Sequence, residues 1–233
     1  MRPVCAVLVG GGDIDTEFAA GLIGDLKKSY NVKYIVQDGG LRAAAALDIV
    51  PDLLIGDMDT IGAECACGYA AREHVAIKKL DPVKDDTDSE AAMDAAIVLL
   101  NEQGRDPEAD CVVMIGALGG RFDHSLGNVH VMLKAMKAGV RAYITDSLNR
   151  IHIVKPCSEE TILRAGQFGE YISFIPLTGN VTGLTLRGFK YPVRDIVLEP
   201  GNTLGVSNEL SCDAGTVYYE TGYLLCVESR DRQ

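Results

Sequence analysis

The first half of the chain takes its fold class from Val4-Cys5-Ala6-Val7-Leu8-Val9-Gly10-Gly11-Gly12-Asp13. Six apolar residues in a row, with neither helical nor alternating spacing, are typical of a strand that is buried on both faces of a sheet. The three glycines and the aspartate then end this strand in a loop. Strands buried on both faces occur in parallel sheets that helices cover. The stretch therefore predicts an α/β domain.

Similar short runs recur through the first 150 residues and alternate with segments of helical composition. The runs lie at 34–36, 52–55, 75–77, 111–115 and 142–145, and the helical segments at 17–28, 89–103 and after residue 123. We expect all of these runs to be buried strands. Alternation of this kind implies right-handed βαβ crossovers and a mostly parallel sheet. Ligands of such sheets bind beyond the carboxyl ends of the strands.

The pattern changes after about residue 150, where the helical period disappears. Short runs with a period of two residues follow at 171–175, 181–186, 203–207, 216–219 and 223–227. Such runs, punctuated by glycine-containing turns, predict a compact antiparallel sandwich or barrel. The sequence thus predicts two domains. The first is a mostly parallel α/β/α sandwich over residues 1–149, and the second is a smaller antiparallel β-sandwich over residues 150–233.

The charge and composition of the chain exclude several classes of partner. It has 33 acidic and 22 basic residues among 233, a net charge of −11. This balance disfavours binding to nucleic acid phosphates or to an anionic membrane. No apolar run reaches the roughly 18 residues of a membrane span, and the run at 4–9 is too short for a signal peptide. Seven scattered cysteines predict reduced core thiols. We expect a cytoplasmic protein that binds small ligands, metals or cations, with no nucleic acid and no membrane partner.

Aspartates follow nearly every predicted strand of the first half. They are Asp13, Asp15, Asp38, Asp57, Asp59, Asp81, Asp85, Asp86, Asp88, Asp123 and Asp146. If the strands are parallel, these carboxylates converge on one edge of the sheet, where they repel one another unless a cation lies among them. Hard oxygen ligands without clustered histidine or cysteine predict Mg²⁺, which shares its ligand shell with substrate phosphates.

Helix capping is the alternative explanation for any single one of these acids. Thr87-Asp88-Ser89-Glu90 fits a capping box in front of a helix, and Asp123 fits a cap of the next helix. Capping accounts for one carboxylate per helix. It does not account for the extra acids in Gly56-Asp57-Met58-Asp59-Thr60 and Lys84-Asp85-Asp86-Thr87-Asp88. We therefore predict that these two clusters are functional and that the isolated acids are structural.

A glycine-rich loop follows the predicted strand at 111–115. In Gly116-Ala117-Leu118-Gly119-Gly120-Arg121-Phe122-Asp123-His124, a strand end is combined with a guanidinium and a carboxylate. Such loops suit phosphate, because amides approach closely at glycine, the helix N-terminus is positive, and Arg121 offers a bidentate contact. His124 is either a second phosphate donor or a histidine that bonds a carbonyl. Neither a Walker P-loop nor a dinucleotide-binding glycine motif occurs.

These motifs resemble those of the thiamine pyrophosphokinase family, and most closely its bacterial branch. Residues 56–60 are similar to the family's Gly-Asp-x-Asp-Ser, with Thr60 in place of serine. Residues 84–88 are similar to Lys-Asp-x-Thr-Asp, and residues 119–124 to Gly-Gly-Arg-x-Asp-His. The segments 171–176, 183–192 and 207–210 resemble the family's β-domain, so the resemblance covers nearly the whole chain.

The resemblance implies an activity and an assembly. The β,γ-pyrophosphoryl unit of ATP, the co-substrate, would be transferred to the hydroxyethyl oxygen of thiamine with Mg²⁺ as cofactor, giving thiamine diphosphate and AMP. The first domain would bind ATP and Mg²⁺, and the second would bind thiamine and form the dimer. The resemblance also implies a homodimer in which each active site lies between the α/β domain of one chain and the β domain of its partner.

The resemblance further implies roles for individual residues. Mg²⁺ would be held by Asp57, Asp59 and Asp88, with Asp38 nearby, and the nucleotide would be contacted by Thr87, Gly119, Gly120, Arg121 and His124. Catalysis would involve Arg121, Asp123 and Asp85, of which the two aspartates would orient or deprotonate the attacking hydroxyl. Thiamine would be contacted by Ser207 and Asn208. The chain has no tryptophan. An aromatic wall for thiamine is therefore expected from Tyr191 or Phe189, or it is missing.

The sequence leaves two other functions open. Asp57-Met58-Asp59 also resembles the nucleophile and acid of haloacid dehalogenase-like phosphatases. That motif continues to threonine or valine where this chain has Ile61, and it normally follows the first strand. A nucleotide- or thiamine-sensing protein would keep the cleft and lose turnover. Every motif acid is present, which favours the enzyme.

Overall fold

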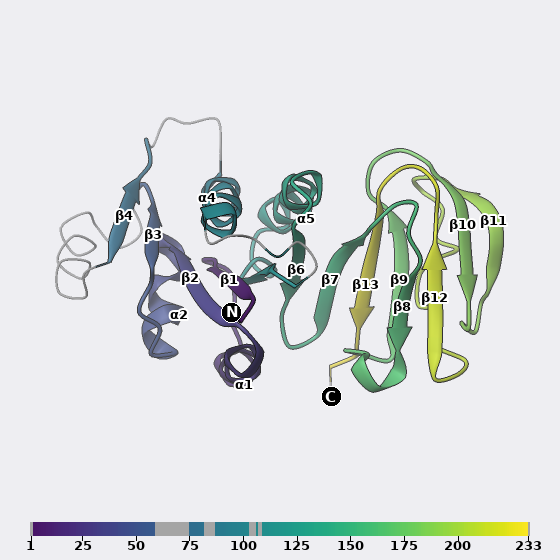
Figure 1. Cartoon of the computed structure of the whole chain (residues 1–233), viewed down its shortest axis with the longest axis horizontal. Helices are drawn as coiled ribbons and strands as arrows, with labels where there is room; N and C mark the ends of the chain where they lie inside the picture. The colour runs from purple at the N-terminus through teal and green to yellow at the C-terminus, as the bar shows by residue number, and fades with distance from the viewer. Residues whose placement is uncertain (1, 59–74, 82–86, 103–105, 107–108, 233) are drawn as a thin grey trace. The chain divides into compact units, whose positions relative to one another are not determined.

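The computed structural model describes residues 2–58, 75–81, 87–102, 106 and 109–232. The chain divides into two compact units, unit 1 (Met1–Ser147) and unit 2 (Leu148–Gln233) (Figure 1). The division lies two residues before the boundary that the sequence suggested.

Unit 1 contains a parallel sheet whose described strands lie in the order β4-β3-β2-β1-β5-β6. The strands are β1 (Val4–Val9), β2 (Asn31–Gln37), β3 (Leu53–Gly56), β4 (Ala76–Lys79), β5 (Cys111–Ile115) and β6 (Arg141–Thr145). Each neighbouring pair is parallel. All six residues of β1 are buried, as the uninterrupted apolar run predicted. The strand expected at 75–77 forms, but its burial was predicted wrongly, because β4 is an edge strand with four exposed residues.

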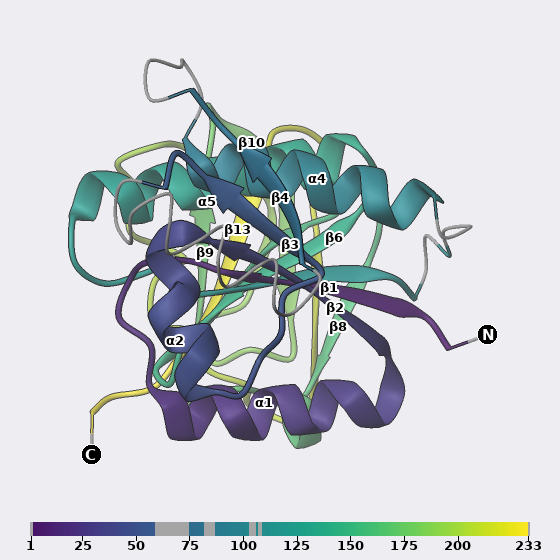
Figure 2. The same cartoon turned by 90° about the vertical axis from the view of Figure 1, so that its left-hand side faces the viewer.

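Helices cover both faces of this sheet, which confirms the predicted α/β/α arrangement. Helices α1 (Thr16–Ser29) and α2 (Leu41–Ala46) lie on one face, and α4 (Asp88–Glu102) and α5 (Phe122–Lys137) on the other (Figure 2). On the first face, Cys5 and Val7 of β1 pack in one core with Ile23 of α1. Asp15 caps α1 by accepting a hydrogen bond of 3.0 Å from the N–H of Phe18, so this isolated acid has a structural role.

The order of the chain reverses between β1 and β5, which are neighbours in the sheet. In an open parallel sheet this reversal opens a crevice beyond the strand ends. Two glycine-containing loops meet there. The N–H of Gly10 donates to the carbonyl of Ile115 (2.8 Å) and the N–H of Gly12 to that of Gly116 (2.9 Å). A Cβ on Gly12 would lie 2.6 Å from the Gly116 oxygen, so only glycine allows this approach.

Unit 2 is built in its described part from antiparallel strands in two sets. One set has the order β7-β13-β9 and the other β11-β10-β12-β8. Their bounds are β7 (Asn149–Val154), β8 (Glu160–Leu163), β9 (Tyr171–Pro176), β10 (Val181–Arg187), β11 (Val193–Leu198), β12 (Ala214–Tyr218) and β13 (Leu224–Ser229). Both sets contribute to one core, where the rings of Phe174 and Phe189 meet edge to face at 5.4 Å. The sequence prediction of an antiparallel β-unit is confirmed.

Two details of the predicted strands in unit 2 are wrong. Residues 203–207 form a turn rather than a strand, and Ser207 has a φ of 55° that ends the extended run. Conversely, three strands, β7, β8 and β11, were not predicted. The residues of β11 are half-buried or exposed apart from Leu198, so this strand lacks a clear apolar alternation.

The described cysteines are free thiols in two environments. Cys5, Cys111 and Cys226 are buried, as predicted, whereas Cys157 and Cys212 are exposed, so the prediction of core thiols is wrong for these two. Cys65 and Cys67 lie outside the described residues. Across the part of the chain that is described, no helix is long and apolar enough to cross a membrane.

Candidate active site

Asp38 lies where β2 ends, at the carboxyl edge of the unit 1 sheet. It is buried, and its Oδ1 accepts a hydrogen bond of 2.6 Å from the N–H of Gly39. A Cβ on Gly56, the last residue of β3, would lie only 2.8 Å from Cγ of Asp38. The Asp38 carboxylate therefore lies directly against the end of β3, beside the residue that precedes Asp57.

Asp57 and Asp88 belong to segments that adjoin Asp38. Asp57 follows β3, Asp88 is the first residue of α4, and both are half-buried. The side-chain amide of Gln37 donates to the hydroxyl of Ser89 at 3.2 Å. Since these two residues adjoin Asp38 and Asp88 in the chain, the bond joins the end of β2 to the start of α4. The segments that carry Asp38 and Asp88 are therefore neighbours at the carboxyl edge of the sheet, although they are far apart in the sequence.

The predicted metal site is only partly covered by the described residues, because Asp59 lies outside them, as does the catalytic candidate Asp85. Within the described ranges, no group of three histidine, cysteine, aspartate or glutamate side chains is arranged to hold a metal ion. Asp38, Asp57 and Asp88 offer carboxylate oxygens at one sheet edge, and this donor chemistry fits Mg²⁺. The metal ligand set stays a prediction.

Thr87 caps helix α4. The N–H of Glu90 donates to Oγ1 of Thr87 at 3.2 Å, which is the threonine half of the predicted capping box. The Glu90 carboxylate instead binds Nζ of Lys134 on α5 (2.9 Å), and Lys134 also binds Asp94 of α4 (2.8 Å). The hydrogen bonds that the Lys134 ammonium group donates to Asp94 and Glu90 raise the pKa of Lys134. This ion pair network holds α4 against α5.

The loop from β5 to α5 depends on left-handed glycines. Gly116, Gly119 and Gly120 have φ values of 66°, 84° and 63°. A Cβ on Gly119 would lie 3.2 Å from Oδ2 of Asp13. The loop therefore runs close beside the glycine loop that follows β1, and its glycines leave its backbone N–H groups uncovered by side chains of their own.

Asn128 holds this loop from within α5. Its Nδ2 donates to the carbonyl oxygen of Ala117 at 2.7 Å. This role was not predicted, because nothing in the spacing of an asparagine in the second turn of a helix indicates a bond to a residue eleven positions earlier.

We expect Asn128→Ala to raise the KM for ATP about fivefold, the equivalent of one net hydrogen bond of about 1 kcal/mol. The loop would lose its anchor, while the unit 2 residues predicted to bind thiamine are unchanged, so the KM for thiamine should stay constant. Steady-state kinetics with each substrate varied in turn measures both constants. Asn31→Ala, at the opposite end of β2 from Asp38, is the matched control.

Arg121 and Asp123 form an exposed bidentate pair at the start of α5. Nε of Arg121 lies 3.1 Å from Oδ1 of Asp123, and Nη2 lies 2.5 Å from Oδ2. These hydrogen bonds lower the pKa of Asp123 and raise that of Arg121. The residue at the N-cap position is Arg121, and Asp123 is the second residue of α5. The suggestion that Asp123 caps this helix is therefore wrong, since its carboxylate binds a guanidinium.

A hollow of about 390 Å³ lies beside the start of α5. It is lined by Thr87, Glu90, Asp123, His124, Gly127, Asn128, His130, Val131 and Lys134. Three of the predicted site residues, Thr87, Asp123 and His124, thus share one concave surface. The His124 side chain is exposed.

In unit 2, the two residues expected to contact thiamine differ sharply in exposure. Ser207 is exposed and its N–H donates to Oγ of Ser173 at 3.0 Å. Asn208 is 1% exposed, and its side chain binds backbone groups of Tyr191 and Glu209. Direct contact with a ligand therefore remains a prediction for Ser207, and Asn208 has the surroundings of a structural residue.

The two aromatic candidates also separate. Phe189 is 3% exposed and packs on Phe174 in the core, so the suggestion that it forms a wall for a ligand is wrong. Tyr191 is 54% exposed. It borders an apolar cleft of about 250 Å³ that is lined by Leu184, Leu186, Lys190, Tyr191, Pro192, Val193, Ile196, Leu198, Leu204 and Gly205.

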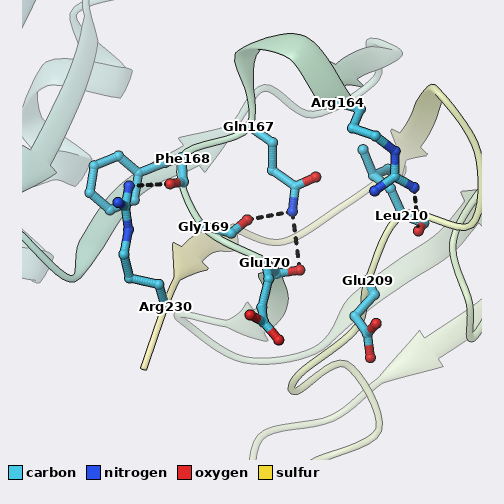
Figure 3. A pocket seen from close by; sticks show the side chains of 8 residues that line it. All are labelled: Arg164, Gln167, Phe168, Gly169, Glu170, Glu209, Leu210 and Arg230. Carbon is cyan, nitrogen blue, oxygen red and sulfur yellow. Dashed lines mark hydrogen bonds between the residues drawn. The ribbon is translucent and has the colours of Figure 1, made fainter. Parts of the chain in front are cut away.

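A second hollow in unit 2, of about 390 Å³, contains none of the predicted site residues (Figure 3). The hydrogen-bond donors of the side chains that line this hollow are bonded to backbone carbonyl groups. Arg164 binds the carbonyl of Leu210 (2.8 Å), Gln167 binds that of Glu170 (3.1 Å), and Arg230 binds that of Phe168. These side chains close loops of the unit, which is a structural role.

Comparison with known proteins assigns both units to one family. Residues 26–144 match the model of the thiamin pyrophosphokinase catalytic domain, and residues 152–224 match that of the thiamin pyrophosphokinase vitamin B1 binding domain. The chain is 31% identical to thiamine pyrophosphokinase of Bacillus subtilis over 205 residues, which are 85% of this chain and 87% of that protein.

Solved structures agree with the sequence relatives. A crystal structure of thiamine pyrophosphokinase from Bacillus subtilis is similar with a TM-score of 0.78 and 30% identity, covering 98% of this chain and 100% of that one. The enzyme from Geobacillus thermodenitrificans gives 0.77 and 29% over 99% of both chains. The two family models, the 31% identity to the Bacillus subtilis protein, and the acidic and glycine motifs at one sheet edge all support the same assignment. The chain belongs to the thiamine pyrophosphokinase family.

Proposed function

We propose that the carboxyl edge of the unit 1 sheet binds ATP with Mg²⁺ and that unit 2 binds thiamine, for the pyrophosphoryl transfer that gives thiamine diphosphate and AMP. Membership of the family makes the chain an enzyme of this kind. The observation that carries the proposal is the contact of Asp38 with Gly56, which brings the acids after β2 and β3 to one point beside the glycine loops.

The metal is assigned to the acids of this edge. Asp57, Asp59 and Asp88 are the proposed ligands, with Asp38 beside them. Mg²⁺ bound there would neutralise charge on the phosphate oxygens. The remaining phosphate contacts are assigned to Thr87, to the backbone of Gly119 and Gly120, to Arg121 and to His124. The helix N-terminus at Phe122 adds positive potential for the same anion.

Arg121 and Asp123 are proposed to exchange partners when substrates bind. A phosphate competes with Asp123 for the guanidinium, and this frees carboxylate oxygens for the attacking hydroxyl of thiamine. Because Arg121 lowers the pKa of Asp123, this carboxylate is ionised at neutral pH and is a weak base. We therefore assign Asp123 to orienting the hydroxyl, with Asp85 as the second candidate for this role.

Arg121→Gln should move the acidic limb of the pH–activity profile to higher pH. Arg121 holds the pKa of Asp123 below its usual value, so its removal lets Asp123 take up a proton at a higher pH than in the native enzyme. If the ionised carboxylate orients the hydroxyl, activity is lost as the pH falls through this raised pKa. The measurement is kcat/KM for thiamine between pH 3 and 7, a range that includes the ordinary aspartate pKa of about 3.9, and an unchanged limb would exclude this role of Asp123.

Thiamine is assigned to unit 2, where Ser207 is exposed and Tyr191 presents its ring at the apolar cleft. The chain is proposed to act as a cytoplasmic homodimer in which the unit 1 residues of one copy and the unit 2 residues of the other serve the same reaction. The family resemblance supports this arrangement.

The test of the function is a product analysis. Purified protein is incubated with thiamine, ATP and Mg²⁺, and the products are separated. AMP and thiamine diphosphate should appear in equal amounts. ADP or free phosphate without thiamine diphosphate would indicate a phosphatase or another kinase, and ATP binding without any product would indicate a sensor.

A further inference from the structure

Asn208 joins three segments of unit 2. Its backbone pairs with Ile172 of β9, since its N–H donates to the Ile172 carbonyl (3.1 Å) and its carbonyl accepts the Ile172 N–H (2.7 Å). Its side chain binds Tyr191. Oδ1 accepts the Tyr191 N–H (3.0 Å), and Nδ2 donates to the Tyr191 carbonyl (2.9 Å). Oδ1 also accepts the N–H of Glu209 at 2.9 Å.

The two bonds to Tyr191 extend a short antiparallel pairing. Phe189 bridges Leu210, and the N–H of Lys190 donates to the carbonyl of Glu209 at 2.8 Å. At the next step the backbone of Asn208 is engaged by β9, so its side-chain amide replaces the backbone as the partner of Tyr191. A carboxamide offers both a donor and an acceptor for this purpose, whereas the ionised carboxylate of an aspartate, which is of similar size, offers acceptors only.

Tyr191 is fixed at its backbone while its ring stays accessible. Pro192 follows it and restricts its backbone to extended conformations. The ring is about half exposed and borders the apolar cleft of unit 2. Lys190, whose ammonium group lies 5.6 Å from the ring centroid, is itself paired with Glu209 at 2.6 Å. An accessible aromatic ring on a rigid backbone is suited to stacking on a heteroaromatic ligand.

We infer that Asn208 is a positioning residue for thiamine, which fixes the Tyr191 ring and does not itself contact the vitamin. This inference rests on the proposed thiamine site of unit 2. Burial supports it, because Asn208 is 1% exposed. The hydrogen bonds support it as well, because Oδ1 already accepts two N–H groups and Nδ2 is held by the Tyr191 carbonyl. The expectation of a direct contact is replaced by an action through Tyr191.

A double-mutant cycle between Asn208→Ala and Tyr191→Ala tests the inference. Each single variant should raise the KM for thiamine about three- to tenfold, the range that one aromatic contact supplies, and leave the KM for ATP within about twofold. The KM for thiamine of the double variant should exceed that of Tyr191→Ala by no more than about twofold, because Asn208 then has no Tyr191 ring to position. Tyr191→Phe keeps the ring and should bind thiamine as the native enzyme does.

The outcomes separate this inference from the proposed function. Independent, multiplying effects of the two substitutions would show that Asn208 acts on thiamine directly and would overturn the inference. An unchanged KM for thiamine in Asn208→Ala would overturn it too. An unchanged KM in Tyr191→Ala would reject the proposed thiamine wall and the inference together. Absence of thiamine diphosphate with the native protein would instead reject the proposed function.

Tyr219→Phe is the matched control for lost stability. It also removes a buried bond from a side chain to the backbone of unit 2, that of the Tyr219 hydroxyl with the Val154 carbonyl (2.6 Å), but at a distance in the chain from Tyr191. It should lower the melting temperature and leave the KM for thiamine unchanged. If Asn208→Ala does not fold, Asn208→Ser, which keeps one polar group, is carried through the same cycle with the same criteria.

Discussion

Asp57→Asn should lower kcat about 10²- to 10³-fold and leave the fold intact. The change removes one negative charge from the proposed metal site at nearly constant volume, and loss of one preorganised electrostatic contact typically costs this much in rate. Asp57 is half-buried at a strand end and outside the hydrophobic core, so the melting temperature should change little. Product formation at saturating thiamine, ATP and Mg²⁺ measures kcat, and thermal unfolding measures stability.

Asp15→Asn is the matched control for this prediction. It is the same chemical change in a loop that follows a strand of the same sheet, but Asp15 caps α1 through the N–H of Phe18. Asparagine is as good an N-cap as aspartate, so both activity and stability should be retained. Asp59→Asn should behave like Asp57→Asn. Near-native activity in both Asp57→Asn and Asp59→Asn would contradict the metal assignment.

Mixed dimers of two impaired variants should be more active than either parental protein. One copy carries Asp57→Asn in unit 1, and the other carries Ser207→Ala with Tyr191→Ala in unit 2. If each site uses unit 1 of one copy and unit 2 of the other, one site of the mixed dimer has both changes and the other has none. The purified mixed dimer should therefore show about half of the native activity, because one of two symmetric sites is intact.

The experiment requires two affinity tags, so that mixed dimers are separated from the parental ones. Activity is measured at a thiamine concentration far below the KM of the unit 2 variant, where both parental proteins turn over slowly. Activity no higher than the mean of the parents would show that each site is built within one chain. A monomer in analytical ultracentrifugation would reject the dimer itself.

Local sequence determined the architecture of this protein. Buried strands such as β1 are recognisable because a strand covered on both faces must be apolar throughout, and the loss of helical spacing near residue 150 marks the change to an antiparallel unit. Strand-end acids were predicted to converge because parallel strands all end at one edge. The contact of Asp38 with the end of β3 agrees with that reasoning.

Tertiary structure decided which side chains serve as ligand contacts and which as supports. Phe189 and Tyr191 are both aromatic and two residues apart, yet one is in the core and the other is half exposed. Whether each side chain is buried depends on where the second sheet lies, and the local spacing of apolar residues does not predict that. In the same way, the bonds of Asn128 to Ala117 and of Asn208 to Tyr191 depend on loops brought together by packing. Sequence motifs therefore fix the chemistry that is present, and long-range packing fixes which of those groups can reach a ligand.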